Sequence, residues 1–213
     1  MKTIVVIDYG IGNVKSICSA LKSLGFEYEF SRDTDVIMQA SGVILPGVGA
    51  FKHGMSLLEE AGLDKVIKKF AATGKPLLGI CLGMQLLFEK SYEFGEYRGL
   101  GIIEGNVEKL AVEPPIKLPH ISWNEIFPIS NVAWTDTILE NVPAASDMYF
   151  VHSFRGVPTD KDSILAEADY AGIKFCATVK KDNIYGCQFH PEKSAKFGLR
   201  IVENFFNLCE DKK

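Results

Sequence analysis

The chain has 213 residues, of which 47% are hydrophobic and 23% are charged, a composition typical of an ordinary globular domain. Its 23 basic and 27 acidic residues give a net charge of −4, which argues against electrostatic binding of nucleic acid. No apolar run approaches the roughly 18 residues of a membrane span, and the N-terminal residues lack the pattern of a signal peptide. We therefore expect a cytoplasmic protein that binds neither nucleic acid nor a membrane.

The first half of the chain alternates short apolar runs with helical patterns. Runs rich in β-branched and other apolar residues predict buried strands at residues 3–8, 27–31, 42–45 and 76–80. Apolar residues at helical spacing, with glycine as a stop signal, predict helices over residues 14–24, 63–70 and 82 to about 90. This alternation predicts an α/β fold with a mostly parallel central sheet flanked by helices.

The second half of the chain has a different sequence pattern. After about residue 98, extended segments punctuated by glycine and proline predict antiparallel strands. Asp182 and Asn183 separate two strand-like runs and predict a hairpin turn. A final helix presents an apolar stripe from Leu199 to Cys209. Because neither a repeat nor a linker interrupts the chain, we expect residues 1–213 to form one domain.

The sharpest local signal is a cysteine between two glycines, in the order Gly79-Ile80-Cys81-Leu82-Gly83. It has the form of the nucleophile elbow G-x-S-x-G with cysteine in place of serine, at a predicted junction of strand and helix. The glycines leave room for a tight, strained turn, and the helix N-terminus would lower the pKa of the thiol. The alternative is that Cys81 is one more small buried residue, but its position favours a nucleophile.

A cysteine nucleophile needs a base, and the base needs an orienting partner. His190-Pro191-Glu192 supplies both, because side chains two residues apart on an extended segment point the same way and proline favours extended geometry. The same alternation places Gln188 on their face and Cys187 on the opposite face. We therefore predict His190 as the base and Glu192 as its partner; a packed or solvated histidine is the alternative.

Signals for metals and cofactors are incomplete. H-x-E occurs in zinc deaminases, but no P-C-x-x-C follows Glu192, and the five cysteines include no C-x-x-C pair. The run from Gly10 to Lys15 begins like a dinucleotide fingerprint but lacks its last glycine, and no phosphate-binding loop motif is present. We expect no metal and no cofactor.

A glycine-rich loop follows the predicted strand at residues 42–45. Its backbone amides at Gly47, Val48 and Gly49, together with the amide of Leu82, could stabilise an oxyanion formed next to Cys81. The alternative is an ordinary turn between a strand and a helix.

These motifs together resemble the class I glutamine amidotransferases. The likeness rests on the G-x-C-x-G-x-Q pattern at residues 79–85, on the P-G-V-G loop at residues 46–49, and on Q-F-H-P-E at residues 188–192. The resemblance implies a flavodoxin-like α/β fold and a triad of Cys81, His190 and Glu192. It also implies that Gln85, Ser153 and Phe154 hold the substrate glutamine.

Within that family the chain is similar to the glutaminase subunits of imidazole glycerol phosphate synthases, enzymes of histidine biosynthesis. The likeness covers residues 8–13, 45–51, 149–153 and 190–193. It implies that glutamine is hydrolysed to glutamate and ammonia through a cysteine thioester. The ammonia would pass, inside a heterodimer, to a (β/α)8-barrel cyclase that makes imidazole glycerol phosphate and AICAR. Residues matching positions near that interface and its gate are Asn13, Trp123, Tyr149 and Lys193.

Two departures from the family's usual motifs keep other functions open. Ser122 stands where the related motif H-M-G-W-N has glycine, and Ser153-Phe154-Arg155 stands where a second aromatic residue is common. A paralogue could feed a different ammonia acceptor, such as a sugar-modifying synthetase. A cysteine peptidase or other hydrolase on a similar fold is a second alternative, and a binding module without catalysis is a third.

Overall fold

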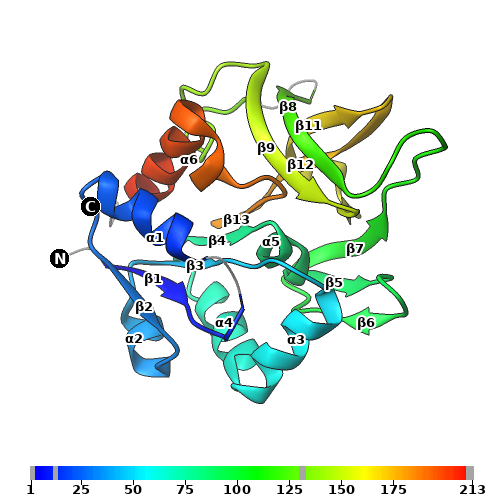
Figure 1. Ribbon diagram of the computed structural model, residues 1–213. Helices are drawn as coiled ribbons and strands as arrows, with labels where there is room; N and C mark the ends of the chain where they lie inside the picture. Colours follow the sequence, from blue (N-terminus) through cyan, green and yellow to red (C-terminus); the bar gives the residue numbers. More distant parts are fainter. Residues whose placement is uncertain (1–2, 12–13, 130–132, 210–213) are drawn as a thin grey trace.

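The computed structural model describes residues 3–11, 14–129 and 133–209 (Figure 1). Within them, a nine-stranded sheet has the order β2-β1-β3-β4-β13-β12-β11-β8-β9. Its strands are β2 (Tyr28–Ser31), β1 (Ile4–Ile7), β3 (Gly42–Leu45), β4 (Leu77–Ile80), β13 (Ile184–Cys187), β12 (Ile173–Lys181), β11 (Ile164–Tyr170), β8 (His120–Pro128) and β9 (Ser146–His152).

The large sheet is parallel in one half and antiparallel in the other. Strands β2, β1, β3, β4 and β13 pair in parallel, and strands β12, β11, β8 and β9 continue the sheet through antiparallel pairs. Every residue of β1, β3 and β4 is buried, as expected for strands covered on both faces. The predicted α/β fold is confirmed: one half of the sheet is parallel, and the antiparallel strands come from the second half of the chain.

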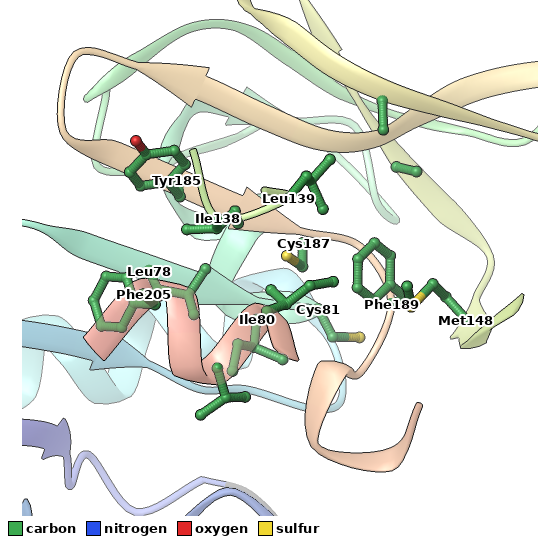
Figure 2. Packing of buried hydrophobic residues seen from close by; sticks show 14 of the residues in the cluster. Leu78, Ile80, Cys81, Ile138, Leu139, Met148, Tyr185, Cys187, Phe189 and Phe205 are labelled. Carbon is green, nitrogen blue, oxygen red and sulfur yellow. The ribbon is translucent and has the colours of Figure 1, made fainter. Parts of the chain in front are cut away.

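Helices cover both faces of the parallel half (Figure 1). One hydrophobic cluster joins Ile4 and Val6 of β1 to α1 and α6, and the other joins Val5 and Ile7 to α2, α3 and α4. The helices are α1 (Val14–Ser23), α2 (Thr34–Gln39), α3 (Phe51–Glu60), α4 (Leu63–Ala71), α5 (Leu82–Leu86) and α6 (Ala195–Leu208). Figure 2 shows the first cluster, with Cys81 at its edge beside Ile80.

A second, four-stranded sheet has the order β10-β7-β5-β6 and lies beside α5 (Figure 1). Its strands are β10 (Phe154–Pro158), β7 (Ile103–Lys109), β5 (Phe88–Ser91) and β6 (Tyr97–Arg98). The helix predicted from residue 82 to about residue 90 is therefore wrong beyond Leu86. Leu86, Leu87 and Phe88 are all buried, and a short run that is apolar on every side does not distinguish a helix from a strand.

Helices α2 and α3 were not predicted from the sequence. Helix α2 is short, and its N-terminus is fixed by the Asp33 side chain, which accepts hydrogen bonds from the amides of Asp35 and Val36.

Among the described helices, none combines the length and apolarity required to cross a bilayer.

The topology brings three loops together. Pro46–Gly49 follows β3, Cys81 follows β4 and His190 follows β13, and these strands are parallel neighbours. Ligands of open α/β sheets bind at the carboxyl ends of such strands. The three sequence motifs therefore meet at one edge of the sheet.

Candidate active site

Cys81 lies on a strained turn between β4 and α5. Its backbone has φ 53° and ψ −110°, a conformation that non-glycine residues adopt rarely and mostly at functional sites. A Cβ atom at Gly79 would lie 2.7 Å from the carbonyl oxygen of Gly83, and one at Gly83 would overlap the carbonyl oxygen of Leu45. Both flanking glycines are therefore required by the turn, as the elbow motif predicts.

Cys187 is not a competing nucleophile. It is fully buried at the end of β13, and burial raises the pKa of its thiol. Its carbonyl oxygen accepts a 2.7 Å hydrogen bond from the amide of Cys81. Cys187 thus supports the elbow through its backbone only.

His190 and Glu192 form a buried pair. The Nδ1 atom of His190 lies 2.9 Å from Oε1 of Glu192, and the two side chains are 4% and 5% exposed. Residues Pro191–Lys193 form a 3-10 turn, so the expectation that the whole segment is extended is wrong. Proline fits the first position of such a turn because no helical hydrogen bond needs its amide. The turn, rather than strand alternation, brings the carboxylate back to the imidazole.

Two hydrogen bonds to the backbone of Tyr149 fix the turn to strand β9. The amide of His190 donates to the carbonyl of Tyr149 over 3.0 Å. The Ser194 hydroxyl accepts from the amide of Tyr149 at 2.9 Å and donates to the carbonyl of His190 at 2.6 Å. These bonds hold the imidazole at the end of the central sheet.

The other ring nitrogen of His190 faces Cys81. Burial alone would lower the pKa of His190, but hydrogen bonding to Cys81 and Glu192 and their negative charges raise it to about 9. Nε2 nevertheless makes no hydrogen bond of normal geometry. The contact between the imidazole and the thiol is therefore a long one.

The predicted oxyanion loop at residues 46–49 occupies one of the predicted oxyanion donors. The amide of Leu82 donates a 3.3 Å hydrogen bond to the carbonyl oxygen of Gly47, so this amide is already occupied. The buried Tyr9 hydroxyl donates to the carbonyl of Pro46 at 2.6 Å. A Cβ atom at Gly47 would lie only 2.6 Å from that hydroxyl oxygen. The loop is therefore closely packed against the elbow.

A pocket of about 320 Å³ opens beside Cys81. The sequence-predicted residues that line it with Cys81 are Val48, Gly49, Leu82, Gln85, Ser153 and Phe154. A larger pocket, of about 610 Å³, contains Ser41, Pro76 and Asn183, which lie just before β3, β4 and β13, at the opposite ends of these strands. It includes none of the predicted catalytic residues, so size alone does not identify the site.

Gln85 holds one wall of this pocket in place. Its Nε2 atom donates to the carbonyl of Phe154 at 2.9 Å and to Oε1 of Gln188 at 3.0 Å. Gln188 in turn directs its own amide towards the sulfur of Cys81, at 3.9 Å. The strand pattern predicts Gln188 on the face of His190 but predicts no role for its side chain.

Sequence reasoning missed Glu93. It follows β5 and lines the pocket, and its Oε2 atom accepts a 2.6 Å hydrogen bond from the amide of Phe51. No motif surrounds Glu93 in the sequence. The pattern also does not predict the small sheet that positions it. The carboxylate brings a negative charge to the pocket.

Three of the four predicted interface residues lie close together. Trp123 of β8 and Tyr149 of β9 are register partners with ring centroids 5.9 Å apart. The ammonium group of Lys193 lies 5.9 Å from the centre of the Tyr149 ring. Trp123 is 50% exposed. Asn13 lies outside the described residues.

In the described part of the chain, no group of three or more histidine, cysteine or carboxylate side chains is arranged so that it could hold a metal ion.

The chain is similar to known proteins over nearly its whole length. The family model "Glutamine amidotransferase class-I" matches residues 5–209. The imidazole glycerol phosphate synthase subunit HisH of Aquifex aeolicus (strain VF5) is 48% identical over 207 residues, which are 97% of each chain. The HisH subunit of Lacticaseibacillus casei (strain BL23) is 46% identical over 208 residues, with 98% of this chain and 97% of the relative covered.

Solved structures give the same fold at lower identity. A structure described as a glutamine amidotransferase has a TM-score of 0.73 at 20% identity and covers 96% of this chain and 98% of its own. A chain from the structure of PurLQS of Thermotoga maritima has a TM-score of 0.71 at 22% identity, with 98% and 99% covered. These two likenesses support the fold alone.

Proposed function

The chain belongs to the class I glutamine amidotransferases, and from that premise we propose that it is the glutaminase subunit of imidazole glycerol phosphate synthase in histidine biosynthesis. The observation that carries the proposal is the buried His190–Glu192 pair next to Cys81 on a strained elbow. The similarity to HisH subunits over nearly the whole chain supports the pathway. We propose one amidotransferase domain over residues 1–213, working in the cytoplasm.

In the proposed reaction the Cys81 thiolate attacks the side-chain amide carbon of glutamine. His190 takes the thiol proton and then gives it to the departing nitrogen, so that the carbon–nitrogen bond breaks and neutral ammonia leaves. Glu192, 2.9 Å from Nδ1, holds the imidazole in the required tautomer and stabilises its charged form. Water then hydrolyses the thioester, which releases glutamate and restores the thiol.

The pocket beside Cys81 offers groups of the right polarity for glutamine. Gln85 and Phe154 form one wall, and Ser153 lies next to them. The Glu93 carboxylate keeps one oxygen available beyond its bond to the Phe51 amide. We propose that this oxygen pairs with the α-ammonium group of the substrate, which would place the amide at the other end, near Cys81.

The oxyanion site requires a change in the loop. The peptide that joins Gly47 to Val48 now directs its carbonyl oxygen at the Leu82 amide. Rotating that peptide would free the Leu82 amide and turn the Val48 N–H towards the same place. Two donors would then face the developing charge. We propose that glutaminase activity is low until the loop makes this change.

The partner would dock on the paired strands β8 and β9. Ile121, Trp123 and Phe127 alternate along one face of β8 and are 58%, 50% and 42% exposed, and Tyr149 of β9 lies beside Trp123. Large exposed apolar side chains that cluster in this way are typical of interaction sites. We propose that a (β/α)8-barrel cyclase subunit covers this face in a heterodimer, with a passage that takes ammonia from Cys81. Lys193 would lie at its gate.

The proposal is tested by measuring glutamate release from glutamine, with and without a cyclase subunit. We expect low activity for the chain alone, strong activation by the partner, and loss of activity in Cys81→Ala. Cys18→Ala, which removes a half-buried thiol on α1, is the matched control and should behave as the wild type does. Activity that survives in Cys81→Ala would exclude the proposed nucleophile. Cleavage of peptides but not of glutamine would favour a peptidase.

A further inference from the structure

The buried Tyr9 side chain holds the start of the oxyanion loop at residues 46–49. Tyr9 follows β1, which is the neighbour of β3 in the large sheet, and it is only 3% exposed. Its hydroxyl donates to the carbonyl oxygen of Pro46 over 2.6 Å, a short distance for a hydrogen bond between two oxygens. The proposed chemistry at Cys81 does not use this hydroxyl, so its place beside the loop requires another explanation.

The direction of this hydrogen bond is fixed by chemistry. Burial raises the pKa of Tyr9, and a negative charge on Cys81 raises it further, so the hydroxyl keeps its proton at neutral pH. A carbonyl oxygen carries no proton and can only accept. Tyr9 is therefore the donor, and it fixes the orientation of the peptide that joins Pro46 to Gly47.

The next peptide of the loop, which joins Gly47 to Val48, is held less firmly. Its carbonyl oxygen accepts from the amide of Leu82 at 3.3 Å, a long distance for a hydrogen bond between nitrogen and oxygen. Within the described residues, the amide of Val48 donates no hydrogen bond. Rotation of this peptide breaks one long bond. Rotation of the peptide before it would instead break a short bond and leave the buried Pro46 carbonyl without this donor.

Both ends of the segment that carries the loop are fixed. At the start, the ring of Pro46 restricts its own φ angle, and Tyr9 holds its carbonyl. At the far end, the Phe51 side chain is fully buried, and its amide donates to Glu93 at 2.6 Å. A change of loop conformation is therefore confined to the residues between Pro46 and Phe51.

Gly47 lies directly against the elbow, so its position matters for the chemistry. A Cβ atom at Gly47 would lie 2.6 Å from the Tyr9 hydroxyl oxygen, and 3.0 Å from both the amide nitrogen of Gly83 and the Cβ atom of Leu82. Tyr9 and the elbow thus enclose Gly47 from two sides. Because hydrogen bonds weaken steeply as their geometry departs from the optimum, a displaced Gly47 would misplace the Val48 N–H that follows it.

We propose that Tyr9 is a positioning residue of the oxyanion site. Its hydroxyl fixes the peptide between Pro46 and Gly47, so that only the peptide between Gly47 and Val48 rotates and the Val48 N–H arrives at one defined place. The inference rests on the proposed glutaminase function. The described residues that line the glutamine pocket do not include Tyr9, so its effect belongs to the reaction step rather than to the binding of glutamine.

Glutamine kinetics test the positioning role. Tyr9→Phe removes the hydroxyl and keeps the ring. In the complex with the cyclase subunit, we expect kcat for glutamate release to fall about tenfold, the effect of one buried hydrogen bond, with little change in KM. Tyr170→Phe is the matched control and should keep the wild-type kcat, because it also loses a hydroxyl that donates to a backbone carbonyl, that of Lys117 at 3.0 Å. An unchanged kcat in a folded Tyr9→Phe enzyme, or a change in KM alone, would overturn the proposal.

Nitrogen-15 relaxation dispersion in the same complex shows which peptide moves. The Gly47 amide belongs to the peptide that Tyr9 holds, and the Val48 amide belongs to the next one. In the wild type we expect exchange at Val48 and little at Gly47, and in Tyr9→Phe exchange at both. Equal exchange at Gly47 and Val48 in the wild type, or exchange at neither, would overturn the inference. Absence of glutaminase activity in the wild type would instead contradict the proposed function, while the NMR result stands by itself.

Discussion

The amide of Leu82 donates its hydrogen bond to the carbonyl oxygen of Gly47. The Leu82 amide is the donor that the elbow would offer to an oxyanion. The loop at residues 46–49, which should supply the second donor, therefore occupies the first. Rotation of one peptide exchanges the carbonyl oxygen of Gly47 for the N–H of Val48. We propose that this arrangement is a resting state, which a ligand activates only by binding the rotated state more tightly.

Val48→Pro should remove one of the two donors of the proposed oxyanion site, the Val48 amide, and keep the other, the Leu82 amide. Proline has no N–H, so rotation of the peptide would bring no donor to the charge. We expect kcat for glutamate release in the activated complex to fall by about 10²–10³-fold with little change in KM. Val48→Ala, which keeps the amide, is the control and should retain most of the activity. Equal activity of the two variants would exclude the Val48 amide as a donor.

Glu192→Gln should change the titration of His190. The carboxylate is one cause of the increase of the His190 pKa from its ordinary value of 6.5 to about 9, so the variant should show a lower pKa by NMR. We also expect kcat to fall by about 10²-fold or more, because the charged imidazole loses its partner.

The same shift predicts a pH dependence of stability. Because the pKa of His190 is higher in the folded than in the unfolded state, its contribution is fully present below about pH 6.5. It is lost as the pH rises through about 9, and amounts to about 3 kcal/mol. The free energy of unfolding of wild type and Glu192→Gln should therefore converge at high pH. A difference that grows with pH would contradict the sign.

Gln85→Glu should be more harmful than Gln85→Met. The amide nitrogen of Gln85 donates to two acceptors, Phe154 and Gln188. A carboxylate there would face both acceptors without a proton and would be buried unpaired. We expect Gln85→Glu to reduce the free energy of unfolding by about 1–3 kcal/mol more than Gln85→Met, measured by denaturant titration. Both should raise the KM for glutamine.

Trp123→Ala should weaken the complex without weakening the fold. The side chain is 50% exposed, so its loss should change the free energy of unfolding by only about 0.5 kcal/mol. Affinity for the cyclase subunit, measured by calorimetry, should fall at least about tenfold. Phe30→Ala is the matched control, because Phe30 is 44% exposed on β2 at the opposite edge of the sheet. Equal effects of the two variants would contradict the proposed docking face.

Gly83→Ala should be among the most destabilising single changes. The new methyl group would overlap the carbonyl oxygen of Leu45, and backbone atoms cannot move aside as a side chain can. We expect a loss of more than about 4 kcal/mol in the free energy of unfolding. Gly74→Ala, at φ 76° with no atom within 4 Å of the new Cβ, should cost about 1–2 kcal/mol. The comparison separates steric overlap from backbone strain.

The sequence predicted the parallel strands and the elbow because both leave strong local signals. Runs such as Ile4–Ile7 are apolar at every position, and Cys81 requires glycine on both sides. The pairing of His190 with Glu192 was predicted for a reason that proved wrong, since a 3-10 turn replaces strand alternation.

Other features depend on contacts between distant segments. Glu93 lines the pocket because it follows β5, the first strand of the small sheet along the chain. An ambiguous apolar run precedes that strand. The occupation of the Leu82 amide by Gly47 is a contact between backbone groups, which side-chain patterns do not encode. The contact between the His120 and His152 rings likewise joins β8 to β9 and cannot be recognised from one strand.

The attachment of the His190 turn to Tyr149 has a consequence for solubility. Strand β9 is the last strand of the nine-stranded sheet, and unpaired edge strands recruit other chains into aggregates. The Tyr149 amide and carbonyl are taken up by Ser194 and His190, so they are not available to an incoming strand. Loosening the turn at His190 would therefore expose a sheet edge as well as displace the proposed base, and aggregation would accompany the loss of activity.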